Sequence, residues 1–237
     1  MRYFGGKQRI SKPLTAYLNS VLKPQQAFYD LFCGSCNVIT QIDKNRPLYA
    51  NDIHHELICM WTHVQCGGEL PDNISNEEYQ NIRLDVPYQY ASWLKGFVGF
   101  GCSFAGKWWG GYARGGEGRN YCQNAKNSVL KKAEKLHNVY FSSKPYDAVK
   151  IEQPNSMLYC DIPYKDTTGY SVGQFNHEQF YSWTKKMKIR GHTVLVSEYE
   201  HNVPEGWKVV WRHESKKDIR DKEGKQQPTV EILMTPC

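Results

Sequence analysis

The sequence has no long apolar run. No stretch approaches the roughly 18 apolar residues that a membrane-spanning helix needs, and residues 1–7 contain no apolar segment of the kind that a signal peptide carries. Among the 8 cysteines only Cys33 and Cys36 have paired spacing, which alone could form a redox pair or half a zinc site. No second pair completes a metal site. These absences predict a cytoplasmic protein with reduced cysteines, no bound metal and no membrane partner.

Internal repeats and low-complexity tracts are missing too, and the composition excludes a disordered chain. The 237 residues, 40% of them hydrophobic, suit one large domain or one domain that carries a smaller insertion. Lysine and arginine number 30 against 24 acidic residues, a formal charge of +6. This excess fits a polyanionic partner, and it fits equally a mildly basic protein without one. The 7 tryptophans and 16 tyrosines could stack on bases or fill a core.

Short apolar runs alternate with helical patterns along most of the chain. Strands are expected at residues 27–32, 47–53, 139–142, 156–160 and 193–197. Helices are expected over 54–65, where Gly67 and Gly68 follow, and over 177–188. Strands that alternate with helices predict an α/β fold with a mostly parallel sheet.

The C-terminal segment follows a different pattern. Strands are expected at 207–211 and 229–234 without a helix between them, joined by a charged loop over 215–227. This arrangement predicts a terminal antiparallel hairpin.

The middle of the chain interrupts the alternation. Residues 67–127 are rich in glycine, with aromatic and basic residues among the glycines. Such a segment makes a poor strand–helix–strand unit. We therefore expect 67–127 to be an insertion in a domain formed by 1–66 and 128–237.

Three short motifs carry candidate chemistry. In the first, the strand at 27–32 runs into a turn of small residues at 33–36, and Asp52 closes the next strand. Glycine lets the backbone approach a ligand closely, and an acid after the second strand can accept hydrogen bonds from ribose hydroxyls. The motif suits a nucleoside cofactor, although a tight turn with a helix cap at Asp52 explains the same residues.

The second motif is the tetrapeptide Asp161, Ile162, Pro163 and Tyr164, which follows an apolar strand. The Asp161 carboxylate and a neighbouring carbonyl could accept both hydrogens of an exocyclic amine, and Tyr164 could stack on a flat base. Because aspartate and proline are common turn residues, a turn that ends the strand is the alternative.

The third motif lies at the N-terminus, where Tyr3 and Lys7 flank a glycine pair. Tyr3 could stack on a cofactor, and Lys7 could attract a carboxylate or DNA. A frayed terminus is the alternative.

Taken in order, these motifs resemble the DNA adenine methyltransferases of the Dam type (D12 class), particularly their phage-encoded members. That family carries aromatic-x-Gly-Gly-Lys, Asp-x-Phe-x-Gly-Ser-Gly, Asn-Asp, an inserted target-recognition region and Asp-Pro-Pro-Tyr. The same order extends over nearly the whole of this chain. Residues 106–114, 168–170 and 194–199 also look like the phage members.

The resemblance implies a Rossmann-like methyltransferase fold, S-adenosylmethionine as methyl donor and double-stranded DNA as substrate. It implies a monomeric protein of DNA methylation or restriction-modification that acts in the host cytoplasm if a phage encodes it. Tyr3 and Lys7 would contact the cofactor, and Asp52 its ribose. Asp161 would lie between the cofactor and the target amine. Other residues implied in cofactor binding are Asp30, Phe32, Gly34 and Phe141.

Two positions depart from the family pattern. Cys36 stands where the family has the last glycine of the first loop, so a positive φ there would strain the backbone. Ile162 stands where the family has proline; it keeps the carbonyl, loses rigidity and adds an N–H that needs a partner. A homologue that binds DNA without methylating it therefore stays open, as does a methyltransferase for RNA adenine or a protein amide.

DNA contacts are expected from the glycine-rich insertion and the charged C-terminal loop. The basic residues that could meet phosphates are Lys107, Arg114, Arg119, Lys216, Lys217 and Arg220. For any one of them, a solvated surface position is the alternative. The target adenine would leave the duplex to reach the methyl group.

Overall fold

The computed structural model describes residues 1–85, 88–116, 118–165, 175–220 and 226–237, and within these ranges the side chains of 215–220 and 226–229 are not described. The resemblance at residues 168–170 therefore lies outside the described residues.

Seven strands form one sheet in the order β3-β2-β1-β4-β5-β7-β6. The strands are β1 (Phe28–Asp30), β2 (Leu48–Asn51), β3 (Val139–Ser142), β4 (Met157–Cys160), β5 (Thr193–Tyr199), β6 (Trp207–Arg220) and β7 (Gln226–Pro236). Strand β4 is parallel to both β1 and β5, whereas β7 is antiparallel to both β5 and β6. All four residues of β4 are buried, as expected for a central strand covered on both faces. The prediction of a mostly parallel, Rossmann-like α/β sheet with a C-terminal antiparallel hairpin is confirmed.

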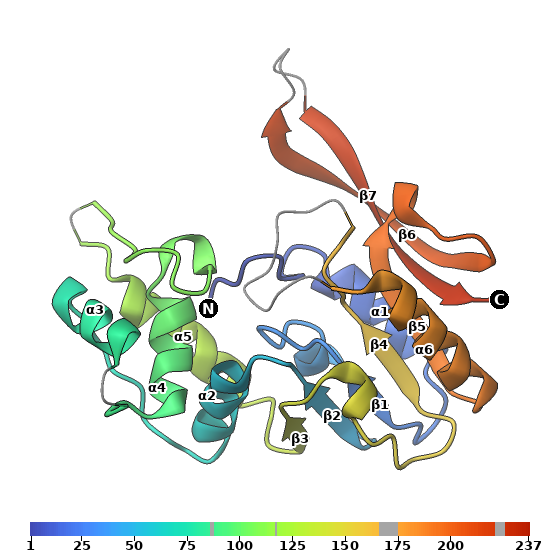
Figure 1. Cartoon of the computed structure of the whole chain (residues 1–237), viewed down its shortest axis with the longest axis horizontal. Coiled ribbons are helices and arrows are strands. Elements are labelled where there is room, and N and C mark those ends of the chain that lie inside the picture. The colour runs from blue at the N-terminus through green and yellow to red at the C-terminus, as the bar shows by residue number, and fades with distance from the viewer. Residues whose placement is uncertain (86–87, 117, 166–174, 221–225) are drawn as a thin grey trace. The chain divides into compact units, whose positions relative to one another are not determined.

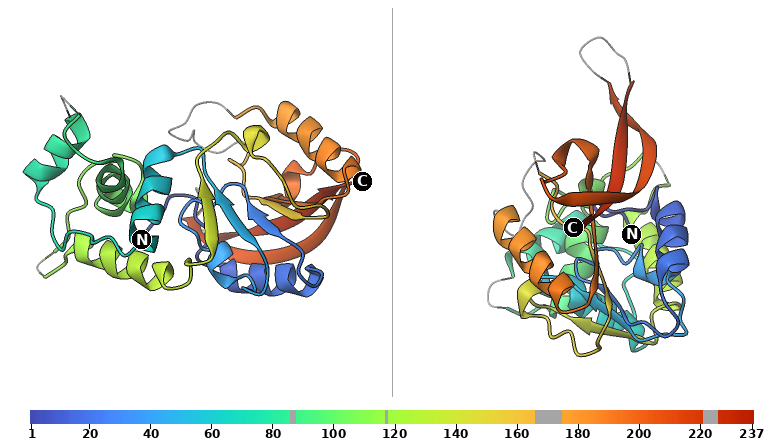
Figure 2. Two further views of the ribbon diagram at one scale, coloured as in Figure 1. Left: turned by 90° about the horizontal axis from the view of Figure 1, so that it is seen from below. Right: turned by 90° about the vertical axis from the view of Figure 1, so that its right-hand side faces the viewer.

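Helices and helical turns occupy most of the intervening chain. They are α1 (Ser11–Val21), α2 (His55–Gln65), α3 (Asn76–Leu84), α4 (Ser92–Gly96), the π-helix η2 (Phe97–Gly101), α5 (Tyr121–Ala133), α6 (His177–Ile189) and the short turns η1 (Ile39–Gln41), η3 (Phe104–Gly106), η4 (Tyr146–Ala148) and η5 (Glu200–Asn202). Helices α1 and α6 cover opposite faces of the sheet at β4 and β5 (Figures 1 and 2). None of the helices in the described ranges combines the length and the apolar character that crossing a membrane requires.

The chain passes repeatedly between two compact units. Unit 1 comprises Met1–Lys7, Cys33–Thr40 and Ala50–Val149, and unit 2 comprises Gln8–Phe32, Gln41–Tyr49 and Lys150–Cys237. The expected insertion at 67–127 lies entirely in unit 1.

One prediction about the C-terminal segment is wrong. The sequence indicated a loop over 215–227, but β6 continues to Arg220 and β7 begins at Gln226, with Ser215 paired to Thr229. The two strands form a long ribbon, drawn in red in Figure 1. A two-stranded ribbon satisfies its backbone hydrogen bonds without burying a face, so charged residues do not end it.

Candidate active site

The small-residue loop after β1 is fixed to the end of β2 within unit 1. The N–H of Cys33 donates to the carbonyl of Asn51 over 2.8 Å. The N–H of Gly34 donates to Oδ2 of Asp52 over 2.9 Å, and the N–H of His54 donates to Oδ1 over 3.0 Å. Asp52 is buried, and this burial raises the pKa of its carboxyl while the two N–H groups oppose the rise. Asp52 thus joins the loop to the start of α2, and its oxygens retain lone pairs for a further donor.

Gly34 and Tyr3, both implied in cofactor binding by the resemblance, lie in contact. Gly34 has a φ of +46°, and a Cβ atom there would lie 2.9 Å from Cε1 of Tyr3. The Tyr3 ring therefore packs directly on the loop backbone. On the other side, the indole N–H of the fully buried Trp61 donates to the Gly34 carbonyl over 3.0 Å. Gly34 thus has one neighbour from the N-terminus and one from α2.

Cys36 adopts the left-handed conformation that the sequence left open. Its φ is +55°, its side chain is fully buried, and its N–H donates to the carbonyl of Cys33 over 2.7 Å. The loop therefore keeps the tight turn with a residue for which this conformation carries a steric cost of about 1 kcal/mol.

Lys132 of α5 also holds this loop, although the sequence did not single it out. Its Nζ donates to the carbonyl of Ser35 over 2.5 Å and to Oδ1 of Asn37 over 2.7 Å. Burial lowers the pKa of Lys132 from 10.5 to about 8. Nearly a hundred residues separate the partners in the chain, so no local pattern could have revealed the contact.

An aromatic cluster connects the expected insertion to the loop, all within unit 1. The ring of Phe100, in η2, lies 5.1 Å from Tyr3 and 4.9 Å from His54, and the ring of Trp108 lies 4.2 Å from His54. His54, whose N–H binds Asp52, was another residue that the sequence did not single out. Lys7 is buried in the same unit, and Phe141, on β3, is half-buried.

In unit 2, the structure brings Asp30, Phe32 and Asp161 to the carboxyl ends of β1 and β4. Asp30 is buried and pairs in register with Tyr159, two residues before Asp161. The charges of both carboxylates add to burial in raising the pKa of the Cys160 thiol. Phe32 packs edge-on against the ring of Phe180, with a centroid distance of 5.9 Å.

The rest of the tetrapeptide is largely enclosed. Ile162 and Tyr164 are 2% and 8% exposed. The hydroxyl of Tyr164 donates to Oε2 of Glu231 over 3.1 Å, and its ring meets that of Tyr199 edge-on at 4.5 Å. Burial first, then the charges of Asp161 and Glu231, hold the pKa of Tyr164 well above its usual value. Ile162 therefore anchors the loop by packing where the family has proline.

The basic residues that are expected to contact DNA lie in two places, the glycine-rich segment of unit 1 and strand β6. Lys107, Arg114 and Arg119 are exposed in unit 1, and the ammonium of Lys107 lies 4.5 Å from the centre of the Phe4 ring. Lys216, Lys217 and Arg220 belong to strand β6 and not to a loop. Their side chains lie outside the described residues.

No group of three histidine, cysteine, aspartate or glutamate side chains that could hold a metal ion gathers within the described ranges.

The comparisons with known proteins give one family match. Residues 3–90, less than half of the chain, match the family model of the D12 class N6 adenine-specific DNA methyltransferases. The match includes Tyr3, Gly34 and Asp52 and ends before Asp161. No curated protein sequence matches the chain.

Three solved structures resemble the chain distantly. The first is a putative rRNA methylase from Clostridium thermocellum, with a TM-score of 0.43 and 9% identity over 95% of this chain and 96% of that chain. The second is the rRNA methyltransferase aviRa from Streptomyces viridochromogenes, with a TM-score of 0.47 and 11% identity over 96% of this chain and 84% of that chain. The third is a putative methyltransferase complexed with SAH, with a TM-score of 0.33 and 10% identity over 98% of this chain and 55% of that chain. These similarities are too weak to bear on activity or substrate.

The sheet and the matched segment together support the class of protein, a methyltransferase. Within that class, the family that residues 3–90 match is the D12 class N6 adenine-specific DNA methyltransferases, the same family that the motifs resemble. The predicted resemblance is confirmed over this segment.

Proposed function

We propose that this protein transfers a methyl group from S-adenosylmethionine to the N6 amine of adenine in double-stranded DNA. The observation that carries the proposal is the loop at Gly34, tied by Asp52 to the end of β2, inside the segment that matches the DNA adenine methyltransferase family. Ligands of open α/β sheets bind at the carboxyl ends of the strands, and Asp161 follows such an end at β4.

The residues present fit S-adenosylmethionine. Glycine at position 34 lets the Tyr3 ring pack directly on the loop after β1, and the lone pairs left on Asp52 suit ribose hydroxyls. Lys7 would attract the carboxylate of the methionine part. The other residues proposed to contact the cofactor are Tyr3 and Phe141 in unit 1 and Asp30, Phe32 and Asp161 in unit 2. When bound, the cofactor supplies a methyl group on a positively charged sulfur, which makes the methyl carbon electrophilic.

The tetrapeptide would orient the target amine. Asp161 and the carbonyl of Ile162 would each accept one hydrogen of the N6 amine, which directs the nitrogen lone pair away from both acceptors. Tyr164 would stack on the flipped base, and Pro163 restricts the backbone between these groups. The reaction needs positioning and electrostatic complementarity and no covalent enzyme intermediate. Contacts from Lys107, Arg114 and Arg119, with Lys216, Lys217 and Arg220 on β6, would hold the DNA backbone.

A transfer assay with radiolabelled S-adenosylmethionine on DNA, RNA and a protein substrate tests this assignment. We expect label in adenine of double-stranded DNA. Asp161→Ala should lower turnover by about 1,000-fold, since removal of one preorganised hydrogen-bonding group at a reacting centre lowers kcat by roughly 10²–10³-fold. Cofactor affinity, measured by calorimetry, should fall much less.

Glu205→Ala is the matched control, because Glu205 is an exposed acidic residue in a loop. It should turn over at the wild-type rate. Label in RNA or protein but not in DNA would replace the proposed substrate, and an Asp161→Ala variant that keeps near wild-type turnover would overturn the role of Asp161. A folded protein without measurable cofactor binding would point to the non-catalytic DNA-binding alternative.

A further inference from the structure

The carboxylate of Glu198 is a fully buried charged group next to the reactive loop. Glu198 is the penultimate residue of β5 and has 0% exposure. Burying a carboxylate is costly unless hydrogen bonds satisfy it. Burial raises the pKa of Glu198, and the donors around it oppose that rise. The hydrogen bonds that Glu198 accepts therefore determine whether a carboxylate can stay buried at this position.

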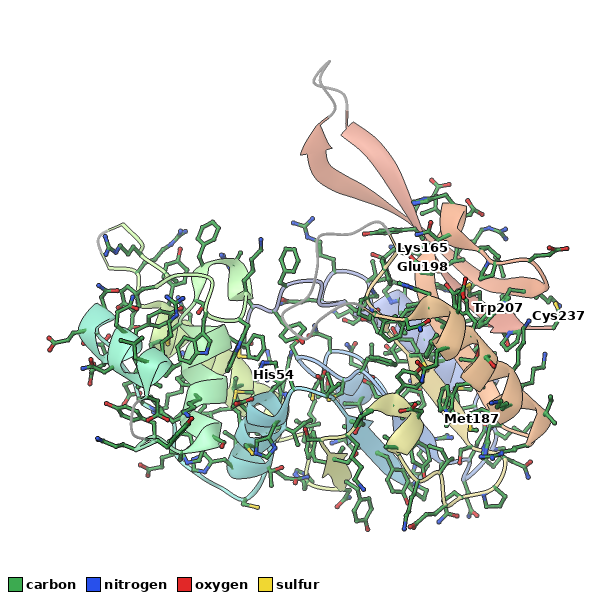
Figure 3. All side chains as sticks on the ribbon, in the orientation of Figure 1. His54, Lys165, Met187, Glu198, Trp207 and Cys237 are labelled. Carbon is green, nitrogen blue, oxygen red and sulfur yellow. The ribbon has the colours of Figure 1, made fainter. Side chains whose placement is uncertain are left out.

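The hydrogen bonds of Glu198 connect the end of β5 to the backbone of Lys165. Oε2 of Glu198 accepts from the backbone N–H of Lys165 over 3.2 Å, and Oε1 accepts from the backbone N–H of Tyr199 over 2.7 Å. Oε1 also accepts from the side-chain amide of Asn202 over 3.3 Å, and the same amide donates to the carbonyl of Lys165 over 3.2 Å. Figure 3 shows Lys165 and Glu198 side by side. Both backbone polar groups of Lys165 are therefore held from the end of β5 and from η5.

Lys165 directly follows the tetrapeptide. Two residues of the tetrapeptide are held by other elements of unit 2. Nε2 of His177, at the start of α6, donates to the carbonyl of Pro163 over 2.9 Å, and Tyr164 donates to Glu231 on β7. Strand β4 fixes the loop before Asp161. The contacts to Lys165 fix its far end. Between these two ends, Ile162 stands where the family that the motifs resemble has proline, so the backbone there has one restraint fewer.

We propose that Glu198, with Asn202, is a positioning residue that fixes the peptide of Lys165 and so holds Asp161 and the Ile162 carbonyl in the geometry needed for turnover. This inference rests on the proposed methyltransferase function. Neither residue touches substrate in this account; both act through Lys165.

Glu198→Gln tests the proposal, since a carboxamide keeps the size but replaces one acceptor oxygen with a donor. One of the two N–H groups, of Lys165 or Tyr199, then loses its acceptor. We expect kcat to fall at least tenfold, with KM for DNA and the cofactor Kd within twofold of wild type. Asn202→Ala should lower kcat about threefold. Because Asn202 is less buried than Glu198, this variant keeps the test usable if Glu198→Gln fails to fold.

Glu200→Gln is the matched control, because Glu200 lies two residues further on and pairs with the exposed Arg212 instead. It should leave kcat unchanged. A Glu198→Gln variant with wild-type kcat, or one in which KM and cofactor Kd rise as kcat falls, would overturn the positioning role.

Amide hydrogen exchange separates this inference from the proposed function. Exchange at Lys165 should be at least tenfold faster in Glu198→Gln than in wild type, and unchanged in Glu200→Gln. If the wild type methylates nothing, the proposed function fails, whereas unchanged exchange at Lys165 would show that Glu198 does not hold the loop.

Discussion

Three features of the structure constrain the residue at position 34. Its backbone lies in the left-handed region, the Tyr3 ring occupies the space where a Cβ would be, and its N–H binds the buried carboxylate of Asp52. Glycine is the one residue type that satisfies the first two without strain. The geometry of the loop that is proposed to bind the cofactor therefore depends on glycine at position 34.

Gly34→Ala should accordingly lower the free energy of unfolding by roughly 2 kcal/mol, from backbone strain and displacement of the Tyr3 ring. It should also weaken S-adenosylmethionine binding at least tenfold. Urea unfolding and calorimetry measure the two effects. Gly116→Ala is the control, since a Cβ there meets nothing within 4 Å and its φ is not positive. Equal stability and affinity in the two variants would contradict this view of the loop.

The backbone conformation of Cys36 could not be predicted from the sequence. The sequence posed a conditional statement, that a positive φ would strain this position, and only the backbone could decide it. The φ of +55° at a fully buried cysteine resolves the question in favour of strain. Ile162 is similar: the sequence indicated lost rigidity, whereas its burial shows that packing restrains it.

At the scale of elements, the strands were predictable because each is an apolar run bounded by turn residues. The run at 139–142 coincides with β3, and the helix expected over 54–65 is α2. Helices α1, α3, α4 and α5 were not assigned, although Ser75 and Glu78 at the start of α3 form a capping box, which is a signal that the sequence carries. Strands β6 and β7 are longer than predicted. Their pairing continues through charged residues, which the sequence analysis had assigned to a loop.

Helix α5 supports the loop after β1 through Lys132, and the buried ammonium gives the stability of the protein a defined pH dependence. The pKa of Lys132 is about 8 in the folded state, against 10.5 for a lysine side chain free in water. Between these values the unfolded chain binds more protons, so the free energy of unfolding rises as the pH rises through this window and is lowest below it. From pH 7.5 to 9.5 the contribution is on the order of 2 kcal/mol.

Urea unfolding of the wild type and Lys132→Met at both pH values isolates this contribution, because other titrating groups are common to the two proteins. The stability difference between wild type and variant should widen in favour of the wild type as the pH rises. Lys126→Met, which removes an exposed pair with Asp72, serves as the control. A difference that stays constant with pH would show that Lys132 is not desolvated.

At the scale of the whole molecule, a net charge of +6 is too small to define a DNA-binding face by itself. The proposal depends on where the charges lie. The double variant Lys107→Glu/Arg114→Glu should weaken DNA binding and reduce the slope of log K against log salt by about 2, since each phosphate contact contributes roughly 0.9.

Lys185→Glu/Lys186→Glu changes the net charge equally on exposed positions of α6 and is the matched control. It should leave the salt slope within about 0.5 of wild type. An equal loss in both double variants would mean that overall charge, and not the glycine-rich segment, governs binding.

The strand ends that carry the candidate site could be predicted from the sequence, since Asp30 ends β1 and Asp161 follows the parallel neighbour β4. The supporting residues could not be predicted. Trp61, Lys132, Glu198 and Glu231 act through contacts between segments far apart in sequence, and each has a residue type that is ordinary at a helix or strand position. Motifs indicate which residues could react, and only tertiary structure shows what holds them.

The central claim is DNA adenine methylation that depends on Asp161. Long-read sequencing of DNA from cells that express either the wild type or Asp161→Ala tests it most directly. The account predicts N6-methylated adenines in a shared sequence context with the wild type and none above background with the variant. Unmodified DNA despite folded, expressed wild-type protein, or equal modification by both proteins, would contradict it.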